Sequence, residues 1–427
     1  MKKKIITIFL VLCLTIIYIG MASAHEDKNT CVYYEEKEQN SINDFSSDYG
    51  IQWEMNYGSD PRYGARYEGP QPIGDCDNDG DNELLISGRD ASIRVMEWSE
   101  SLQTYEETHT LHSPFYQIFM FLSKFNESYA PPDAGGMAIG DLTGDGENEI
   151  AATWYAAVYK FIGGKYRIIG FNPWIWWNGG GNADCYIGDC DNDGQNELIM
   201  SGGPTWHGDE DMPEIVIFKW NGFRLVKVAE WDDPDAPGYV YMAGLGDTDY
   251  DGENEIVLGT AGKVIVLNWN AETGEFDPTI IKNTGWEDYP FACICKDSTN
   301  DGQVEIHVGY HSPWVTFFKW NGEEYEEYYE NHWPGEEGII EALDVGDVDD
   351  DGFPEVCVGT DLVHILQWNG DTYVEEAVLP TWGGLAVTSI GDCDNDGKNE
   401  INVGSVWIDH GEDFMSWVFK YGWDSNE

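Results

Sequence analysis

Lysine and arginine are scarce in this chain: 22 of its 427 residues are basic against 79 Asp and Glu, so the formal net charge at pH 7 is −57. A surface of this sign repels phosphate backbones and anionic headgroups. We therefore expect neither nucleic acid nor an anionic membrane as a partner. The same acidity is compatible with a saline habitat.

Long hydrophobic runs are also missing, apart from one at the start. Residues 1–24 combine Lys2, Lys3 and Lys4 with an apolar run and end in Ala22-Ser23-Ala24, the pattern of a cleaved signal peptide. An uncleaved anchor is the alternative, because the run is slightly long for a signal peptide. We expect a secreted or cell-surface protein, without membrane insertion after cleavage, that is a monomer.

Paired cysteine motifs are absent, although eight cysteines follow residue 24. No C-x₂-C or Cys/His spacing indicates zinc. An even number of cysteines in an exported chain permits disulfides, but spacing cannot assign them. Cys76, Cys190 and Cys393 stand at one repeated position, where we expect a small residue that packs against the fold.

What the chain does contain is a ten-residue acidic motif in seven copies. They are GDCDNDGDNE (74–83), GDLTGDGENE (140–149), GDCDNDGQNE (188–197), GDTDYDGENE (246–255), KDSTNDGQVE (296–305), GDVDDDGFPE (346–355) and GDCDNDGKNE (391–400). From the first Asp, the common template is D-x-D-x-D-G-x-x-E. One copy would be a weak signal, whereas seven in register are strong.

Alternating oxygen side chains around a tight turn suit calcium, which binds six to eight oxygens in a tolerant geometry, and Gly at the sixth position permits the turn. We expect up to seven Ca²⁺, each held by positions one, three, five and nine and the seventh-position carbonyl. The predicted ligand residues are Asp75, Asp77, Asp79, Asp81, Glu83; Asp141, Thr143, Asp145, Glu147, Glu149; Asp189, Asp191, Asp193, Gln195, Glu197; Asp247, Asp249, Asp251, Glu253, Glu255; Asp297, Thr299, Asp301, Gln303, Glu305; Asp347, Asp349, Asp351, Phe353, Glu355; and Asp392, Asp394, Asp396, Lys398, Glu400.

Each motif is followed by a short apolar run such as ELLISG or EIVLGT, and most are followed further on by a hairpin pattern with a turn at or near Asn-Gly. With a strand-like segment before the motif, one repeat makes four antiparallel strands. The first Asp residues are 45 to 66 residues apart. These units predict an all-β, seven-bladed β-propeller with the calcium loops between the first and second strands.

The repeated D-x-D-x-D-G-x-x-E motif resembles that of the FG-GAP/VCBS repeat proteins, the group that includes the integrin α-subunit propeller. The resemblance covers about residues 47 to 423 and implies a calcium loop in each blade. That family usually has Asp at the ninth position, whereas this chain has Glu in all seven copies. Thr143 and Thr299 replace the third-position Asp, and Lys296 replaces a leading Gly, so we expect the second and fifth sites to be weaker.

The domain boundaries follow from these patterns. We expect an acidic, flexible tail over 25–46 and the propeller over 47–427, with an insertion at 111–133 between the first two blades. The last repeat stops one strand short. Residues 47–56 are predicted to supply that strand and so close the ring, with Trp53 in the position that other repeats give to Trp.

The chain lacks H-E-x-x-H, G-x-S-x-G and phosphate-loop motifs, and no acid–base pair stands out among so many carboxylates. His307 and His311 favour a structural interpretation, because His307 takes a strand position that Leu85, Val257 and Cys357 fill in other repeats. Catalysis therefore has no positive support.

In the resembled family, the loops opposite the calcium motifs share a face that carries ligands. Exposed Trp beside polar groups suits sugar rings, although packing of the top layer of the ring is an equal alternative. The residues predicted for this face are Trp154, Trp206, His207, Trp314, Trp333, Trp382, Trp407, Asp409 and His410.

Two functions are considered. The first is a non-catalytic, calcium-stabilised recognition or adhesion module for a glycan or an extracellular surface protein. The alternative is a polysaccharide-cleaving enzyme of the lyase type, since some calcium-loaded propellers that resemble this chain are lyases. The shortage of Lys and Arg disfavours an acidic sugar as the substrate of such a lyase.

Overall fold

The computed structural model describes residues 48–58, 71–88, 91–125, 135–172, 181–203, 213–235, 238–285, 288–336, 338–381, 386–405 and 413–423. The signal segment and acidic tail expected at 1–24 and 25–46 lie outside these residues. The chain divides into two compact units, Met1–Asn43 with Phe115–Pro131, and Asp44–Pro114 with Pro132–Glu427. All the strands of the described residues belong to the second unit.

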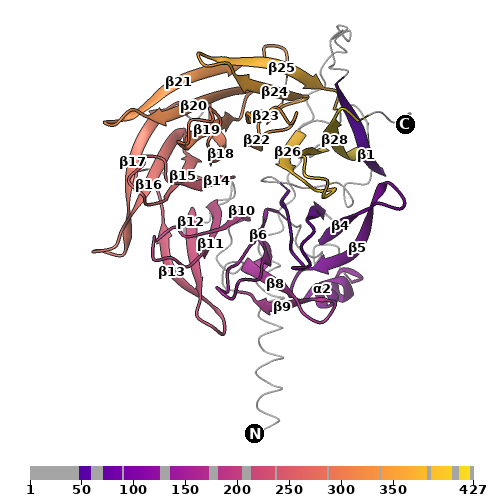
Figure 1. Cartoon of the computed structure of the whole chain (residues 1–427). Coiled ribbons are helices and arrows are strands. Elements are labelled where there is room, and N and C mark those ends of the chain that lie inside the picture. Colours follow the sequence, from indigo (N-terminus) through magenta and orange to yellow (C-terminus); the bar gives the residue numbers. More distant parts are fainter. Residues whose placement is uncertain are drawn as a thin grey trace. The chain divides into compact units, whose positions relative to one another are not determined.

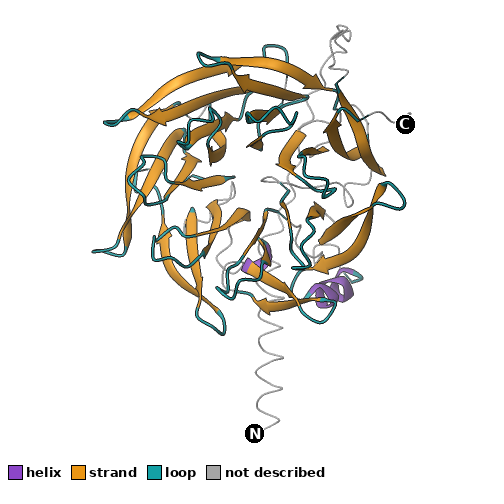
Figure 2. Cartoon of the chain, viewed as in Figure 1, coloured by secondary structure: helices purple, strands orange, loops and turns teal. Residues whose placement is uncertain are grey.

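These strands form seven four-stranded antiparallel sheets, which confirms the predicted seven-bladed propeller (Figures 1 and 2). In chain order the blades are β2 (Ile73–Gly74), β3 (Glu83–Gly88), β4 (Ser92–Ser99) and β5 (Thr104–His112); β6 (Met137–Gly140), β7 (Glu149–Ala152), β8 (Ala157–Phe161) and β9 (Tyr166–Gly170); β10 (Gly181–Gly188), β11 (Glu197–Gly203), β12 (Ile215–Trp220) and β13 (Leu225–Trp231); β14 (Ala243–Gly246), β15 (Glu255–Thr260), β16 (Lys263–Asn270) and β17 (Glu275–Asn283); β18 (Pro290–Lys296), β19 (Glu305–Tyr310), β20 (Trp314–Trp320) and β21 (Tyr325–His332); β22 (Leu343–Gly346), β23 (Glu355–Gly359), β24 (Val363–Trp368) and β25 (Tyr373–Leu379); and β26 (Ala386–Gly391), β27 (Glu400–Ser405), β28 (Phe414–Tyr421) and β1 (Tyr49–Gly58).

The second strand of each blade is apolar on both faces because it lies between neighbouring blades. Every residue of β3, β15 and β19 is buried, and these are the continuous runs ELLISG, EIVLGT and EIHVGY. The fourth strand lies at the outer edge and combines exposed with half-buried residues, as in β21, where the Glu side chains are exposed and the Tyr side chains are half-buried. Burial on both faces therefore explains why the second strands appear in the sequence as short, continuous apolar runs.

Blade 7 is closed by the N-terminal strand, as predicted. Strand β1 pairs antiparallel with β28, and Trp53 lies opposite Val418. The Trp53 side chain is buried and meets the Tyr105 ring of blade 1 edge-on, at 5.8 Å between centroids. Strand β1 thus supplies the outer strand that completes the four-stranded sheet of blade 7.

Glycine stands directly before the first Asp in six of the seven repeats, where it permits close contact between blades. A Cβ atom at Gly391 would lie 2.9 Å from the Ile73 side chain of the next blade, and one at Gly188 would lie 2.4 Å from that of Leu245. Lys296, which replaces this Gly in blade 5, instead pairs with Asp344 of blade 6 at 2.5 Å. The Gly of the repeated Gly-Asp dipeptide therefore has a packing role that does not depend on a bound ligand.

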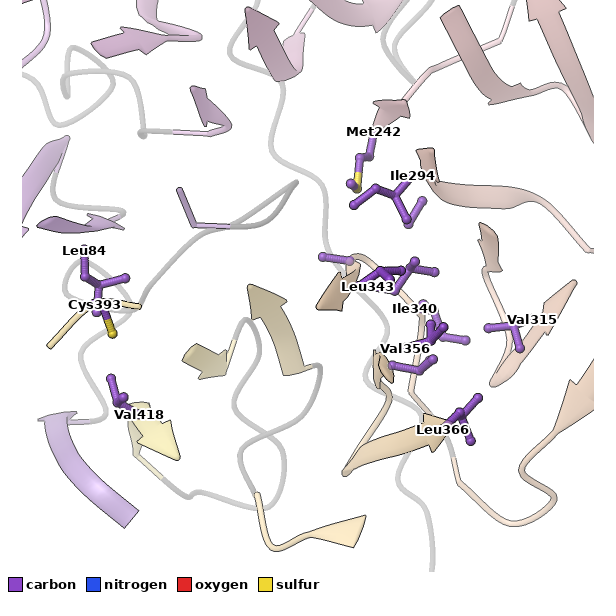
Figure 3. Packing of buried hydrophobic residues seen from close by; sticks show 14 of the residues in the cluster. Leu84, Met242, Ile294, Val315, Ile340, Leu343, Val356, Leu366, Cys393 and Val418 are labelled. Carbon is purple, nitrogen blue, oxygen red and sulfur yellow. The ribbon is translucent and has the colours of Figure 1, made fainter. Parts of the chain in front are cut away.

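The core runs through several blades. Figure 3 shows Val356 and Leu366 of blade 6 in one cluster with Ile340 and Leu343, and all four side chains are fully buried. At the ring axis, the first strands of all seven blades line a cavity of about 250 Å³, and its lining combines aliphatic side chains with the charged Asp184, Lys296 and Asp344.

Within the predicted insertion 111–133, residues Tyr116–Ser123 form the helix α2 and none of them is buried. The insertion begins later than expected, since β5 continues to His112. Among the described residues, no helix combines the length and the apolar character needed to span a membrane.

Candidate metal centre

The seven acidic motifs fold into loops of one geometry, numbered here 1 to 7 in chain order. In loop 1, Asp75 Oδ2 accepts a hydrogen bond from Gly80 N at 3.1 Å, and Glu83 Oε2 accepts one from Cys76 N at 2.8 Å. The same two bonds recur in the other six loops. The first Asp therefore fixes the turn, and the last Glu closes the loop.

Backbone conformation explains two further features of the motif. Residues at the fourth and sixth positions have positive φ, as with Asn78 at 67° and Gly80 at 103°. Asn and Gly tolerate this conformation better than other residues do. The turn directs alternate side chains inward, as the spacing predicted.

The predicted ligands come together in most loops. Groups whose oxygens lie within 4.8 Å of one another are Asp75, Asp77 and Glu83; Asp189, Asp191, Asp193 and Glu197; Asp247, Asp249 and Asp251; Asp297, Asp301 and Glu305; and Asp347, Asp349 and Asp351. The fifth-position Asp also accepts the seventh-position N–H, for example Asp251 Oδ1 from Glu253 N at 2.9 Å.

In the two loops with Thr at position three, the Thr hydroxyl donates a hydrogen bond to the closing Glu. Thr143 Oγ1 donates to Glu149 Oε1 at 3.0 Å, and Thr299 Oγ1 donates to Glu305 Oε1 at 2.7 Å. A hydroxyl donor thus replaces a like-charged carboxylate, but each of these loops offers one charged ligand fewer.

The small second-position residues pack inward, which confirms their predicted role. Cys76, Cys190 and Cys393 are buried, and each thiol lies within 3.5 Å of Oε2 of its own loop's Glu. The cysteines among the described residues are all free and buried; Cys31 lies outside that part of the chain.

Lysine enters three of the loops. Lys219 Nζ lies 2.8 Å from Asp191, 2.6 Å from Asp193 and 3.0 Å from Glu197. Lys160 in blade 2 and Lys420 in blade 7 each make three ion pairs with their own loop, between 2.5 and 3.2 Å.

These lysines share one position on the third strand of the blade. Lys219 lies directly opposite Glu197 in the β11–β12 pairing, just as Gln367 lies opposite Glu355 in blade 6. Cross-strand partners project from the same face of a sheet, so the side chain extends over the loop. The residues at this position in blades 1 to 7 are Glu97, Lys160, Lys219, Asn268, Lys319, Gln367 and Lys420.

The proton affinities of some inward Asp side chains differ between loops with and without lysine. The pKa values of Asp77 and Asp249 are raised, first because these carboxyls are partly buried and second because Asp79 and Asp251 repel their charge. Asp193 behaves oppositely: the hydrogen bond from Lys219 lowers its pKa.

The closing Glu is the most perturbed carboxyl of loops 1, 4 and 6. Burial raises the pKa values of Glu83, Glu255 and Glu355 to about 7, and it does the same to Glu400 of loop 7, although Lys420 lies 2.7 Å from that carboxylate. An uncompensated carboxylate at such a position is costly, and a bound cation offsets that cost.

The donor set of loops 1, 4 and 6 fits calcium. It consists of hard carboxylate oxygens from alternate residues. Among the described residues, the buried Asp247 Oδ1 of loop 4 has no hydrogen-bond partner, and the same holds for Asp191 Oδ1 of loop 3. Loops 2, 3 and 7 fit calcium less well, because an ammonium already contacts the same oxygens.

Comparison of the seven third strands in the sequence would have found this position. Lysine precedes an aromatic residue in YKF, FKW, FKW and FKY, which hold four of the chain's 22 basic residues. These lysines lie outside the ten-residue motif, so the motif alone does not indicate that any of them contacts a loop.

The predicted ligand face has a mixed outcome. Trp154, Trp314 and Trp333 are buried, which is the packing alternative for these three residues. Trp314 stacks on Tyr310 and on His332, and Trp333 stacks on His364 and donates to Glu375 at 3.0 Å. The other predicted residues lie outside the described residues: Trp206, His207, Trp382, Trp407, Asp409 and His410.

The structural interpretation of His307 is confirmed. Its side chain is fully buried, its Nε2 lies 2.7 Å from Ser298 Oγ, and burial lowers its pKa to about 3. A histidine held neutral in the core is a poor acid–base catalyst at physiological pH.

Comparison with known proteins supports the fold. The chain is similar to BBS1N in the crystal structure of its complex with ARL6DN soaked with lead, with a TM-score of 0.56, 12% identity and coverage of 88% of this chain and 97% of that chain. For the mercury-soaked form of the same complex, the TM-score is 0.54 and the identity 13%, over 88% of this chain and 97% of that chain. For the Dos1 propeller, the TM-score is 0.50 and the identity 9%, over 82% of this chain and 78% of that chain.

Identities this low show the fold alone. No protein-family model matches the chain, and no curated protein matches it either. What the comparisons and the sheet order show together is a seven-bladed β-propeller.

Proposed function

We propose that this chain is an exported, calcium-stabilised β-propeller of the FG-GAP/VCBS type that acts as a non-catalytic recognition or adhesion module for a glycan or an extracellular surface protein. The observation that carries the calcium part is the uniform loop geometry. In all seven loops the first Asp and the last Glu bind the same backbone amides, which leaves inward carboxylate oxygens at fixed positions.

The repeated motif supports the assignment to the FG-GAP/VCBS type, with Glu in place of the usual Asp at position nine. The hydrogen bonds of the Glu side chain explain that difference. Glu255 Oε2 accepts bonds from both the amide and the hydroxyl of Thr248, at 2.8 Å each, so its longer side chain reaches back across the loop. Its other oxygen is the one that would bind the cation.

Recognition is assigned to the loops opposite the acidic motifs, which vary from blade to blade. Because Trp154, Trp314 and Trp333 are buried, the proposal there rests on Trp206, His207, Trp382, Trp407, Asp409 and His410. Aromatic rings with neighbouring polar groups match the apolar faces and hydroxyl edges of a sugar.

The test is a binding screen of the chain from His25 onward against arrays of glycans and of cell-surface proteins, with and without millimolar calcium. We expect calcium-dependent binding to a defined ligand class and no turnover of it. Cleavage of a bound polysaccharide would contradict the non-catalytic assignment, and binding that is indifferent to calcium would contradict the role of the loops.

A further inference from the structure

We infer that lysine replaces calcium in loops 2, 3 and 7, so that only loops 1, 4, 5 and 6 take the metal. This inference rests on the proposed function, because it specifies which loops of the same propeller bind calcium. The observation behind it is the position of three ammonium groups, those of Lys160, Lys219 and Lys420, among the predicted calcium ligands.

Loop 3 shows the geometry most directly. Lys219 Nζ contacts oxygens from the third, fifth and ninth positions, Asp191, Asp193 and Glu197, all within 3.0 Å. The ammonium donates hydrogen bonds to Asp191 and Asp193, and its contact with Glu197 is an ion pair. Its side chain is 18% exposed and that of Glu197 is fully buried, so the contact is sheltered from water.

Loop 7 repeats this arrangement in an independent part of the chain. Lys420 Nζ lies 2.5 Å from Asp394, 2.9 Å from Asp396 and 2.7 Å from Glu400, again the third, fifth and ninth positions. Gln52 Nε2 donates to Asp394 at 2.5 Å as well, so the closing strand β1 contributes a further donor. Donors from two strands, Lys420 of β28 and Gln52 of β1, therefore contact the carboxylates of loop 7.

Loop 2 is the third example and differs in one partner. Thr143 occupies position three, and Lys160 instead contacts Asp145, Glu147 and Glu149 at 2.7, 3.2 and 2.7 Å. With one carboxylate fewer at position three, a single positive charge matches this loop better than a double one.

Calcium and the lysine cannot share a loop. Calcium requires six to eight oxygens at about 2.3–2.6 Å, and in loops 3 and 7 the ammonium occupies three of the same side chains. Entry of the metal would require the lysine to leave a largely buried position and give up three ion pairs. An ammonium kept nearby would also repel the cation.

Blade 5 supplies a natural contrast, because it has lysine at the same position without this contact. Lys319 Nζ lies over the Tyr328 ring, 5.2 Å from its centroid, and makes no ion pair among the described residues. A cation–π contact on the outer strand thus holds this lysine away from loop 5. Loop 5 remains open, although Thr299 leaves it one carboxylate short.

The remaining loops have neutral or acidic residues at this position. Asn268 accompanies loop 4, Gln367 donates to Asp351 and Glu355 in loop 6, and Glu97 lies near enough to Asp77 to raise its pKa. None of these side chains carries a positive charge. Four loops are thus open to calcium, and three are permanently compensated by the chain itself.

The test counts calcium by native mass spectrometry on the chain from His25 onward at millimolar calcium. We expect four ions on the wild type and five on Lys219→Gln, because Gln367 shows that Gln is accommodated at this position. Lys319→Gln is the matched control and should keep four. Seven ions on the wild type, or an unchanged count on a Lys219→Gln protein that still unfolds cooperatively, would overturn the inference.

A second pair of variants covers the case in which Lys219→Gln does not fold. Asp247→Ala should remove one calcium from the wild-type count, whereas Asp189→Ala should remove none. Loss of one ion from both variants would overturn the inference while leaving the calcium-binding propeller intact. No bound calcium on any variant would instead overturn the calcium part of the proposed function, and this inference with it.

Discussion

Asn82 of loop 1 donates from its side-chain Nδ2 to the backbone carbonyl of Asp392 in loop 7, at 2.8 Å, although 310 residues separate them. Asn148, Asn196, Asn254 and Asn399 make the same bond to the first Asp of the loop before them. Neighbouring loops are therefore linked through the eighth motif position. Loops 5 and 6, with Val304 and Pro354 there, lack this donor.

Ring closure by β1 gives the first prediction. Trp53→Ala removes a buried ring that packs on Tyr105, so the free energy of unfolding should fall by about 3–5 kcal/mol. Met55→Ala, on the exposed part of the same strand, should change it by less than about 0.5 kcal/mol. Urea denaturation measures both, and equal effects would argue against a closing role for Trp53.

The second prediction concerns metal removal. Chelation should lower the melting temperature, because each calcium site at a hundredfold excess over its dissociation constant adds about 2.7 kcal/mol. Hydrogen exchange should then rise in loops 1 and 4 and stay nearly constant in loops 3 and 7, where Lys219 and Lys420 remain. A uniform rise over all seven loops would contradict the lysine substitution.

The third prediction is a pH dependence that calcium reverses. Glu83, Glu255 and Glu355 have folded-state pKa values raised to about 7 by burial, so the folded protein binds more protons than the unfolded one. Their stabilising contribution is present below about pH 4.5 and is lost as the pH rises through 7.

The free energy of unfolding of the metal-free protein should consequently be higher at pH 5.5 than at pH 8, by on the order of a few kcal/mol, and its melting temperature should be higher as well. With calcium present the order should invert, because the metal binds the deprotonated carboxylates. Thermal melts at the two pH values, with and without calcium, check the sign. A calcium-free protein that is more stable at pH 8 would contradict the role assigned to these Glu residues.

The fourth prediction separates structural from recognition tryptophans. Trp314→Ala should cost about 3–5 kcal/mol of stability, because the ring is buried between Tyr310 and His332. Trp206→Ala and Trp407→Ala should leave the melting temperature nearly unchanged and weaken binding of the ligand found in the screen by about 1–3 kcal/mol. Comparable stability losses in all three variants would place these residues in one structural set.

Much of the molecule could be predicted from the sequence because its signals are local and repeated. The motif spacing, the Gly at position six and the Asn-Gly turns each act within a few residues, and all three recur in the structure with the expected geometry. Asn221, for example, accepts hydrogen bonds from Phe223 N and Arg224 N to form one such turn. Even closure by residues 47–56 followed from counting strands.

Only the tertiary structure decided how the charge of each loop is balanced and which aromatic rings are buried. Lys219 is 22 residues from Glu197 in sequence, and its proximity depends on the β11–β12 register. Lys319 has the same local sequence, FKWNG, yet contacts Tyr328 instead. Likewise, Trp314 and Trp333 resemble exposed loop residues in the sequence and are covered by His332 and His364 of other strands. Cross-strand neighbours, which no local pattern specifies, determine both outcomes.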